Sequence, residues 1–571
     1  MVSLPKTTAR KWLLRGAQWV LMALGLLIYS CARITMPGGG PKDEIPPKLL
    51  KTYPEQGHTG FKGKKIRLVF DKQIGVRNIY NKLVVTPKLP KLKGQPSYTY
   101  SVRGNSLKLA LKVPLEEDTT YTFNFNDAIT DITEGNVAEQ PVLTLSTGDH
   151  VDAMYVTGQV KDLMTDQLAS EVLVALYRAD NDELNLLNST PDYFGKTDKN
   201  GLFRLDNVRK GRYYLRAGGN QQNQLVVDPG VDAYGFVKDP VDLTTGPVEG
   251  VKLAILKADV REFKLQGQQP QGQHFELCFS KPVVDYTLTL NKGTKKFKVL
   301  YSHLVDKEQV IRVYNTFGLL EEDSLAASLT ARDVLGKVIE EPISIRFREG
   351  RYQKYRDSYR FEPASGAAIN ADFVGTMTLK KPIKEVVADR LFFVFNGKDN
   401  VYIKPEDLKY NAQRDVVTIS KRLDPKLLKP QKSKEKEGKE PAGLVLHIDE
   451  EAFIPIEGES NDAMRYVYTF KNPKAYGTIM GTVTTQAPGF IVQLLDTNYE
   501  VVDEIRNKRN YQFKEVAPGN YKLRVLVLKA KDTAWDFGNI LERRMPDPVV
   551  FYPAEIGVFA NWEITDIDFS F

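Results

Sequence analysis

Residue types that commonly do chemistry are few and scattered in this chain. Its five histidines, His58, His150, His274, His303 and His447, show neither an HExxH pattern nor a pair at i, i+4 that would place two ligands on one helix face. The sequence also contains no Gly-x-Ser-x-Gly elbow, no phosphate-binding glycine loop and no Cys-His constellation. We therefore expect a protein that is not an enzyme and that holds no metal ion or cofactor.

One group of carboxylates lies close together in the sequence, at Asp127, Asp131 and Glu134. A glycosidase would need two such carboxyl groups facing a sugar across a cleft. This group follows a strand-like run and ends at Gly135 and Asn136, which is typical of a turn whose polar side chains bind nearby backbone. The sequence favours a structural turn over catalysis.

A second polar group leaves a hydrolase open as an alternative. His447, Asp449, Glu450 and Glu451 follow one another at the end of a strand-like run. A hydrolytic site would have to be assembled from these and other loops of the middle domains. We expect these side chains to be solvated.

The N-terminus has the pattern of an export signal followed by a lipid anchor. Residues 1–15 are basic and free of acids, residues 16–30 are nearly all apolar, and Cys31 follows. The segment Leu27 to Cys31 resembles a bacterial lipobox, whose cysteine is lipidated and becomes the first residue. We predict a signal peptide at 1–30 and a lipidated Cys31 that begins a flexible tether at 31–45, with an uncleaved anchor and a plain secreted form as alternatives.

The composition narrows the class of partner and the source of stability. Lys and Arg number 79 against 72 Asp and Glu, and four of the basic residues lie in the first 15, so the body is close to neutral. A near-neutral body gives no electrostatic case for binding nucleic acid. The second cysteine is Cys278, and a lipidated Cys31 cannot pair with it, so we expect no disulfide within the mature chain.

After residue 46 the pattern predicts an all-β chain. Short alternating runs such as 65–70, 106–111 and 120–125 are broken by turn residues, and no long amphipathic helix follows the signal peptide. A Gly-x-Tyr-x-Leu motif with matching upstream spacing occurs at 211–215 and again at 519–523, which indicates two copies of one β module. A weaker echo links 66–72 to 275–281.

These patterns divide the body into tandem β-sandwiches. The predicted domains are an Ig-like domain at 46–148, a repeated module at 153–250, an Ig-like sandwich at 256–350, a sandwich at 355–474 with a low-complexity Lys-rich loop at 425–441, and the second module copy at 476–571.

Several of these segments resemble a known family. The residues that carry the first resemblance are Pro41, Lys42 and Asp43, Phe70 and Asp71, the run Thr119 to Phe125, and Asp131 to Asn136. They resemble lipoproteins of Bacteroidota that carry an N-terminal Ig-like domain of the bacterial surface-layer (SbsA) type. The modules at 153–250 and 476–571 are similar to transthyretin-like, carboxypeptidase-regulatory β-sandwiches. The resemblance implies an architecture and a cellular address rather than an activity.

The resemblance also points to one modification. Envelope proteins of this phylum can be O-glycosylated at Asp-Ser or Asp-Thr followed by an apolar residue or Thr. Thr119, Ser324 and Thr533 fit that pattern.

Taken together, these observations predict a non-enzymatic envelope lipoprotein, an elongated series of sandwiches that acts as a scaffold or a protein-binding subunit. Its expected partners are outer-membrane proteins or complexes, with the membrane reached through the lipid anchor. Residues 32–36 lack the acidic cluster of a surface-export signal, which favours the periplasmic face, with surface exposure left open. The alternative is a glycan-binding accessory protein in which Trp535 and Trp562 stack on sugar rings, although single aromatics in strands usually face inward.

Overall fold

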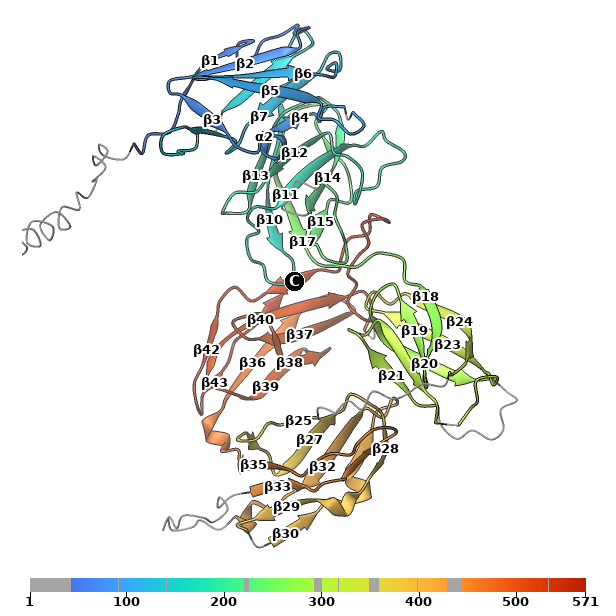
Figure 1. The fold of residues 1–571 in the computed structure, drawn as a ribbon. Coiled ribbons are helices and arrows are strands. Elements are labelled where there is room, and N and C mark those ends of the chain that lie inside the picture. Colours follow the sequence, from blue (N-terminus) through green and yellow to red (C-terminus); the bar gives the residue numbers. More distant parts are fainter. Residues whose placement is uncertain are drawn as a thin grey trace, which may run out of the picture. The chain divides into compact units, whose positions relative to one another are not determined.

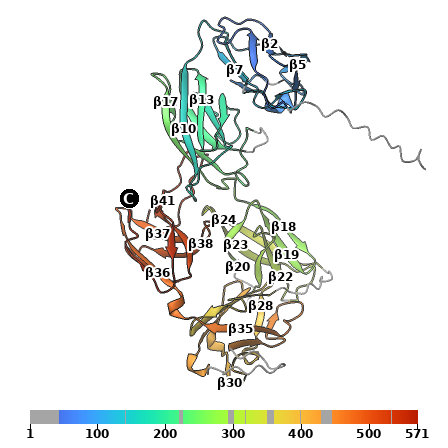
Figure 2. The same ribbon diagram turned by 90° about the vertical axis from the view of Figure 1, so that its left-hand side faces the viewer.

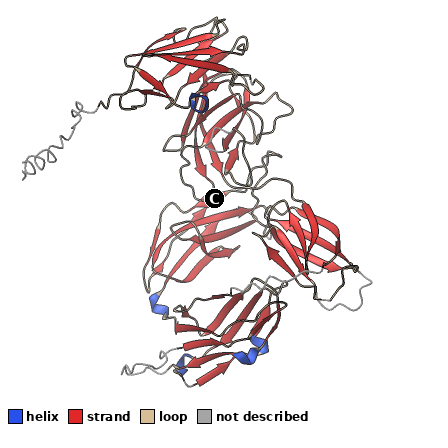
Figure 3. Ribbon diagram, in the orientation of Figure 1, coloured by secondary structure: helices blue, strands red, loops and turns tan. Residues whose placement is uncertain are grey.

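The computed structural model describes residues 43–90, 92–139, 141–219, 225–291, 300–316, 318–348, 359–397, 399–428, 444–531 and 533–571. The predicted signal peptide, Cys31, nearly all of the tether and most of the Lys-rich loop lie outside these residues. Strands dominate the described chain, as Figure 3 shows, and the predicted tandem β-sandwich fold is confirmed. The described helices are all single short turns, and none could cross a membrane. The chain divides after Val151 into two compact units, which we describe separately.

The first unit is one β-sandwich (Figure 1). Its larger sheet has the order β1 (Leu49–Tyr53), β2 (Lys65–Phe70), β6 (Ser106–Leu111), β5 (Tyr98–Arg103). The second sheet has the order β4 (Val84–Thr86), β7 (Thr120–Asn124), β9 (Val142–Ser146), and β3 (Ile74–Val76) pairs with β8 (Ile129–Asp131). A short helix, α2 (Ile79–Lys82), precedes β4. Alternate residues of β2 and β6 are fully buried between the sheets, which is the alternation that the sequence showed.

Two sandwiches of the second unit share one strand order, in agreement with the repeat seen in the sequence. In the first copy the sheets are β13 (Leu202–Val208), β10 (Met154–Asp162), β17 (Val248–Ile255) and β12 (Tyr193–Lys196), β11 (Leu173–Arg178), β14 (Arg212–Gly218), β15 (Tyr234–Phe236), with β16 (Val241–Asp242) beside β14. Figure 2 shows β10, β13 and β17 side by side in one layer.

The second copy repeats this arrangement. Its sheets are β39 (Asn510–Val516), β36 (Gly477–Thr484), β43 (Glu563–Ile564) and β38 (Val501–Arg506), β37 (Gly489–Leu495), β40 (Gly519–Leu528), β41 (Val549–Phe551), with β44 (Phe569–Ser570) beside β36 and β42 (Ile556–Val558) beside β40. In both copies the repeated tyrosine makes the same contact, because Tyr213 donates to the carbonyl of Arg209 and Tyr521 to that of Ala517, each at 2.9 Å.

The other two sandwiches of this unit repeat the strand order of the first unit. One has the sheets β18 (Leu265–Gln271), β19 (His274–Phe279), β22 (Val310–Tyr314), β21 (Ser302–Val305) and β20 (Val283–Leu290), β23 (Leu325–Asp333), β24 (Val338–Ile345). In both domains the four-stranded sheet places the four strands that form it in the order first, second, fourth, third along the chain. The weak sequence echo therefore corresponds to a common topology.

The sandwich at 359–470 has the same arrangement, which the sequence did not reveal. Its sheets are β25 (Arg360–Glu362), β27 (Asp372–Thr378), β32 (Val416–Arg422), β31 (Leu408–Tyr410) and β26 (Ala368–Ile369), β35 (Met464–Phe470), β33 (Leu444–Ile448), β29 (Leu391–Phe395), β30 (Asp399–Tyr402), with β28 (Ile383–Val386) paired to β34 (Phe453–Pro455). Four single turns of 3-10 helix complete the described elements, η1 (Ala388–Arg390), η2 (Pro405–Asp407), η3 (Pro425–Leu427) and η4 (Pro473–Ala475).

The two module copies pack against each other through a shared hydrophobic cluster. Tyr177, Tyr234 and Phe236 of the first copy lie in one cluster with Leu526 and Trp535 of the second copy. The first and the last sandwich of the second unit therefore contact each other directly, although two other sandwiches separate them in the sequence. The physical reason is that each copy has an apolar outer face, which burial against the other removes from water.

Candidate functional site

The carboxylates at 127–134 form a turn. One carboxylate oxygen of Asp131 accepts hydrogen bonds from the backbone N–H of Glu134 and of Gly135, both at 2.8 Å, and the other accepts one from the Asn136 amide at 2.9 Å. Burial opposes ionisation of Asp131, but these hydrogen bonds lower its pKa to about 2. Asp127 pairs with Lys82 instead, at 2.6 Å. The turn interpretation is confirmed, because Asp131 is held ionised and its oxygens are already bonded.

The corresponding corner of the second Ig-like sandwich holds a buried ion pair. The side chains of Asp333 and Lys281 are at most 1% exposed, and the Lys281 ammonium lies 2.5 Å from the Asp333 carboxylate. The same ammonium donates to the carbonyl of Asp259 at 2.9 Å. Lys72, the equivalent lysine of the first unit, lies 2.5 Å from Asp43 in a more exposed position. Both lysines therefore tie the start of their sandwich to the end of its second strand.

The histidines and the carboxylates near 450 do not converge on one site. His447 stacks on Phe392 with 5.1 Å between ring centroids, whereas Glu451 pairs with Arg390 at 3.2 Å. His303 is 3% exposed, and burial lowers its pKa to about 4. These groups serve the packing of strands and loops.

One exposed cluster in the first unit has metal-ligand residue types. Asp118, Asp149 and His150 have ligand atoms within 4.8 Å of one another, and all three are exposed. His150 lies 2.6 Å from Asp149, which lowers the pKa of that carboxyl. We interpret the cluster as an exposed ion-pair group at the surface rather than as a metal site.

Trp535 belongs to the contact between the two modules and not to an open binding face. It is 8% exposed, lies in the shared cluster and contacts Phe537 edge-on with 5.0 Å between centroids. Its loop, 529–548, is fixed by ion pairs from Lys529 to Asp536 at 2.6 Å and to Asp547 at 3.3 Å. The prediction that Trp535 contacts a glycan is corrected, because a buried ring cannot stack on a ligand.

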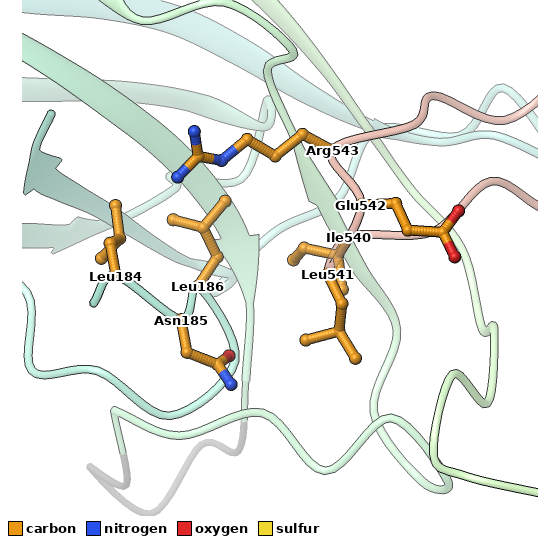
Figure 4. A pocket seen from close by; sticks show the side chains of 7 residues that line it. All are labelled: Leu184, Asn185, Leu186, Ile540, Leu541, Glu542 and Arg543. Carbon is orange, nitrogen blue, oxygen red and sulfur yellow. The ribbon is translucent and has the colours of Figure 1, made fainter. Parts of the chain in front are cut away.

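The same loop borders a pocket of about 330 Å³ at the seam between the modules. Figure 4 shows Arg543 extending over Leu186 while Glu542 points away. Arg543 donates to the Tyr214 hydroxyl at 2.6 Å, and Glu542 lies 3.7 Å from Lys337. The charged groups at the pocket thus serve contacts between domains. The lining residues are Leu184, Asn185, Leu186, Ile540, Leu541, Glu542 and Arg543.

Trp562, by contrast, is presented to solvent. It is 58% exposed and lies beside Phe559, which is 56% exposed, with 4.9 Å between the ring centroids. The turn that carries both rings is fixed, because the backbone N–H of Thr478 donates to the Trp562 carbonyl at 2.8 Å and that of Trp562 donates to the Phe559 carbonyl. Phe559 was not predicted from the sequence, although its spacing of three residues from Trp562 places both aromatic residues in one short turn segment.

The three predicted O-glycosylation residues differ in accessibility. Thr119 is 4% exposed and its hydroxyl donates to the carbonyl of Glu117, so folding hides it and the prediction for Thr119 is corrected. Ser324 and Thr533 are exposed, and the Thr533 hydroxyl donates to the Ala530 carbonyl at 2.9 Å. These two stay predictions.

Comparison with known proteins supports the Ig-like part of the fold. Residues 43–147 match the family model of the bacterial Ig-like domain, which confirms the Ig-like prediction for the first sandwich. No curated protein matches the chain.

Solved structures with some similarity include a pilin subunit, a surface layer protein and a protein of a glucan utilization locus. The major pilin subunit BcpA of Bacillus cereus is 13% identical, over 73% of this chain and 99% of that chain, with a TM-score of 0.13. The surface layer protein SbsC, domains 1-6, is 11% identical, over 84% of this chain and 64% of that chain, with a TM-score of 0.13. SGBP-B of the Bacteroides ovatus mixed-linkage glucan utilization locus is 10% identical, over 72% of this chain and 95% of that chain, with a TM-score of 0.14. These TM-scores are too low to support an argument about this chain.

Proposed function

We propose that this chain is a non-enzymatic cell-envelope lipoprotein, anchored in the outer membrane through Cys31, and a scaffold or protein-binding subunit of an outer-membrane assembly. We further propose that the protein lies on the periplasmic face, that it belongs with the Bacteroidota lipoproteins it resembles, and that its two repeated modules are transthyretin-like. The lipobox-like segment before Cys31 supports the anchor.

The observation that carries the proposal is how the described polar groups are used. The carboxylates, histidines and charged loops that could have served catalysis are engaged in turns, stacking contacts and contacts between domains. An enzyme needs acid, base or nucleophile groups that converge on a substrate position. In the described part of the chain such groups instead form turns and ring contacts within sandwiches and ion pairs between them, as expected for a scaffold.

A pull-down tests this function. Full-length tagged protein is recovered from its native envelope in mild detergent and analysed by mass spectrometry, with Cys31→Ala as the unanchored control. We expect stoichiometric recovery of an outer-membrane protein with the anchored form and its loss with the control. Equal recovery with both forms, or recovery of background proteins alone, would reject the proposal.

A glycan-binding role is the second candidate, and the exposed pair Phe559 and Trp562 favours it. Two exposed rings on a fixed turn can stack on the apolar face of a sugar, and exposed Asn561 and Glu563 lie next to Trp562 in the chain as hydrogen-bonding groups. Glycan arrays probed with wild type and Trp562→Ala test it. Binding of a defined glycan that the substitution removes would support this role, and arrays without signal would reject it.

A further inference from the structure

The N-terminal sandwich has an exposed tyrosine surface along one edge strand. Tyr80 is 49% exposed, and its ring lies 5.5 Å from that of Tyr98 and 5.6 Å from that of Tyr100, measured between centroids. Tyr100 and Val102, on the same face of β5 as Tyr98, are 38% and 37% exposed. Tyr98 itself is buried, 8% exposed, and supports the exposed side chains from below. We call the exposed Tyr80, Tyr100 and Val102, together with the Tyr98 that supports them, the β5 surface.

The backbone of β5 has unpaired groups at these same residues. The N–H of Lys112 donates to the carbonyl of Ser97 at 2.8 Å, and the register continues through Thr99 opposite Ala110 and Ser101 opposite Lys108. Because antiparallel residues alternate between bonded and non-bonded pairs, Thr99 and Ser101 direct their backbone groups toward β6. Tyr98, Tyr100 and Val102 direct theirs away from the sheet, where no partner occurs among the described residues.

Four other edge strands among the described residues carry features that oppose further pairing. Both β1 and β38 have register irregularities, and β38 also carries Asp503 and Glu504. Strand β18 contains Pro270, and β24 contains Pro342 between charged and apolar residues. Strand β5 has a regular register and no proline or charge before its last residue, Arg103. Protected edges are the usual condition, so an unprotected one marks a pairing site.

The related sandwiches shorten the corresponding strand. It has six residues in β5 but four in β21 and three in β31. In β21 the ring of His303 is buried and has a backbone hydrogen bond at Lys380, which belongs to the neighbouring sandwich. Of the three corresponding strands, β5 is therefore the longest, and its outer edge has no pairing strand among the described residues.

We propose that the β5 surface binds an extended segment of a partner protein, which adds as a strand to the free edge of β5. The partner's backbone would bond to Tyr98, Tyr100 and Val102, and its alternate apolar side chains would pack on the tyrosine rings. A strand is the occupant that satisfies both the outward backbone groups and the apolar face, whereas a globular apolar patch would leave the backbone groups unpaired. This inference rests on the proposed function as a protein-binding subunit.

The test uses the full-length anchored protein in its native envelope with a photo-crosslinking phenylalanine analogue at Tyr100 or at Tyr53. Tyr53 is 50% exposed on β1, at the opposite edge of the same sheet, and is the matched control position. We expect an adduct from position 100 that maps to one contiguous partner segment with alternating apolar residues, and none from position 53. An adduct between two copies of this chain, or equal adducts from both positions, would overturn the inference.

Two substitutions then distinguish failure of the inference about the β5 surface from failure of the proposed function. Val102→Lys places a charge on the β5 surface, while Ser101→Lys, its exposed neighbour on the other face of β5, is the control. We expect Val102→Lys to lower the adduct yield roughly five- to tenfold and Ser101→Lys to leave it unchanged, with equal unfolding midpoints for both. Recovery of the partner in the pull-down at wild-type yield with Val102→Lys would overturn this inference and leave the proposed function standing. Failure of wild type to recover any partner would reject both.

Discussion

At the scale of single residues, the second Ig-like sandwich holds a buried ion pair at one corner. Lys281 and Asp333 are almost completely buried, and each is the other's compensating charge. Such a pair contributes little net stability compared with apolar residues, but removal of one partner leaves an uncompensated charge in the interior.

Lys281→Met is therefore expected to destabilise the second Ig-like sandwich by about 3–5 kcal/mol. Arg360→Ala breaks an ion pair whose side chains are 79% and 58% exposed, so it should change stability by less than ~1 kcal/mol. Urea unfolding followed by hydrogen exchange of each sandwich measures both. Similar effects from the two substitutions would contradict this account.

His303 gives the contact between two sandwiches a pH dependence. Burial lowers its folded-state pKa to about 4, below its usual value near 6.5, so the folded state binds fewer protons than the unfolded state between these pH values. Stability is therefore full above about pH 6.5 and falls as the pH drops toward 4. The groups facing His303 include Tyr314, which lies 3.2 Å away, and, at longer range, Asp415, Arg312 and His274.

The measurement is an NMR titration of the His303 ring together with unfolding midpoints between pH 7 and pH 4. His303→Phe should flatten that part of the stability profile. A wild-type titration near pH 6.5 would show that the ring is not buried in solution.

At the scale of elements, the loop 529–548 of the second module copy packs against the first copy, and Trp535 in this loop differs in exposure from Trp562 beyond it. Trp535 lies in the shared cluster, whereas Trp562 is exposed on the turn before β43. Trp535→Ala is expected to cost about 3–5 kcal/mol and to open the loop to proteases, because it leaves a cavity between the modules. Trp562→Ala should change stability by less than ~0.5 kcal/mol.

Thermal unfolding and limited proteolysis with cleavage sites mapped by mass spectrometry measure this difference. Cleavage within 529–548 should rise for Trp535→Ala alone. Equal protease resistance of the two variants would show that the loop does not depend on the Trp535 ring.

Much of each element could be predicted from sequence, because alternation and turn residues act locally. The runs 65–70 and 106–111 became β2 and β6, and the shared Gly-x-Tyr-x-Leu spacing identified the two modules. The turn at Asp131 was also predictable, since its bonds reach only three to five residues along the chain.

What could not be predicted depends on contacts between distant segments. Trp535 and Trp562 lie in similar local sequence, and only the position of the other module decides which ring is buried. The pairing of Tyr80 with Tyr100 likewise joins a short helix to an edge strand. The strand order at 359–470 could not be predicted, because this sandwich shares its topology but no sequence motif with the two related sandwiches.

At the scale of the whole molecule, the second unit is tied together by ion pairs between its sandwiches. Lys337 lies 3.7 Å from Glu542, and Lys471 lies 2.9 Å from Glu515. A zero-length carbodiimide crosslinker should therefore join both pairs within one chain. Mass spectrometry of crosslinked peptides from dilute protein measures this, with Lys404 and Glu406, an exposed pair within one sandwich, as the reactivity control.

Crosslinks of the control pair without those of Lys337 and Glu542 would show that the module contact opens in solution. If Trp535→Ala loses the Lys337–Glu542 crosslink while wild type keeps it, the shared cluster is what holds the two modules together.

The shared cluster also sets an order of events during synthesis. The apolar face of the first module, up to Leu256, is made well before its cover, which begins near Ile491. At ~5–20 residues per second, translation of the intervening chain takes about 10–50 s, long compared with the folding time of one sandwich. During that interval Tyr177, Tyr234 and Phe236 keep their contacts within the first module but lack those from the second, so a chain truncated before residue 491 is expected to expose this apolar face and to aggregate more readily than the full chain.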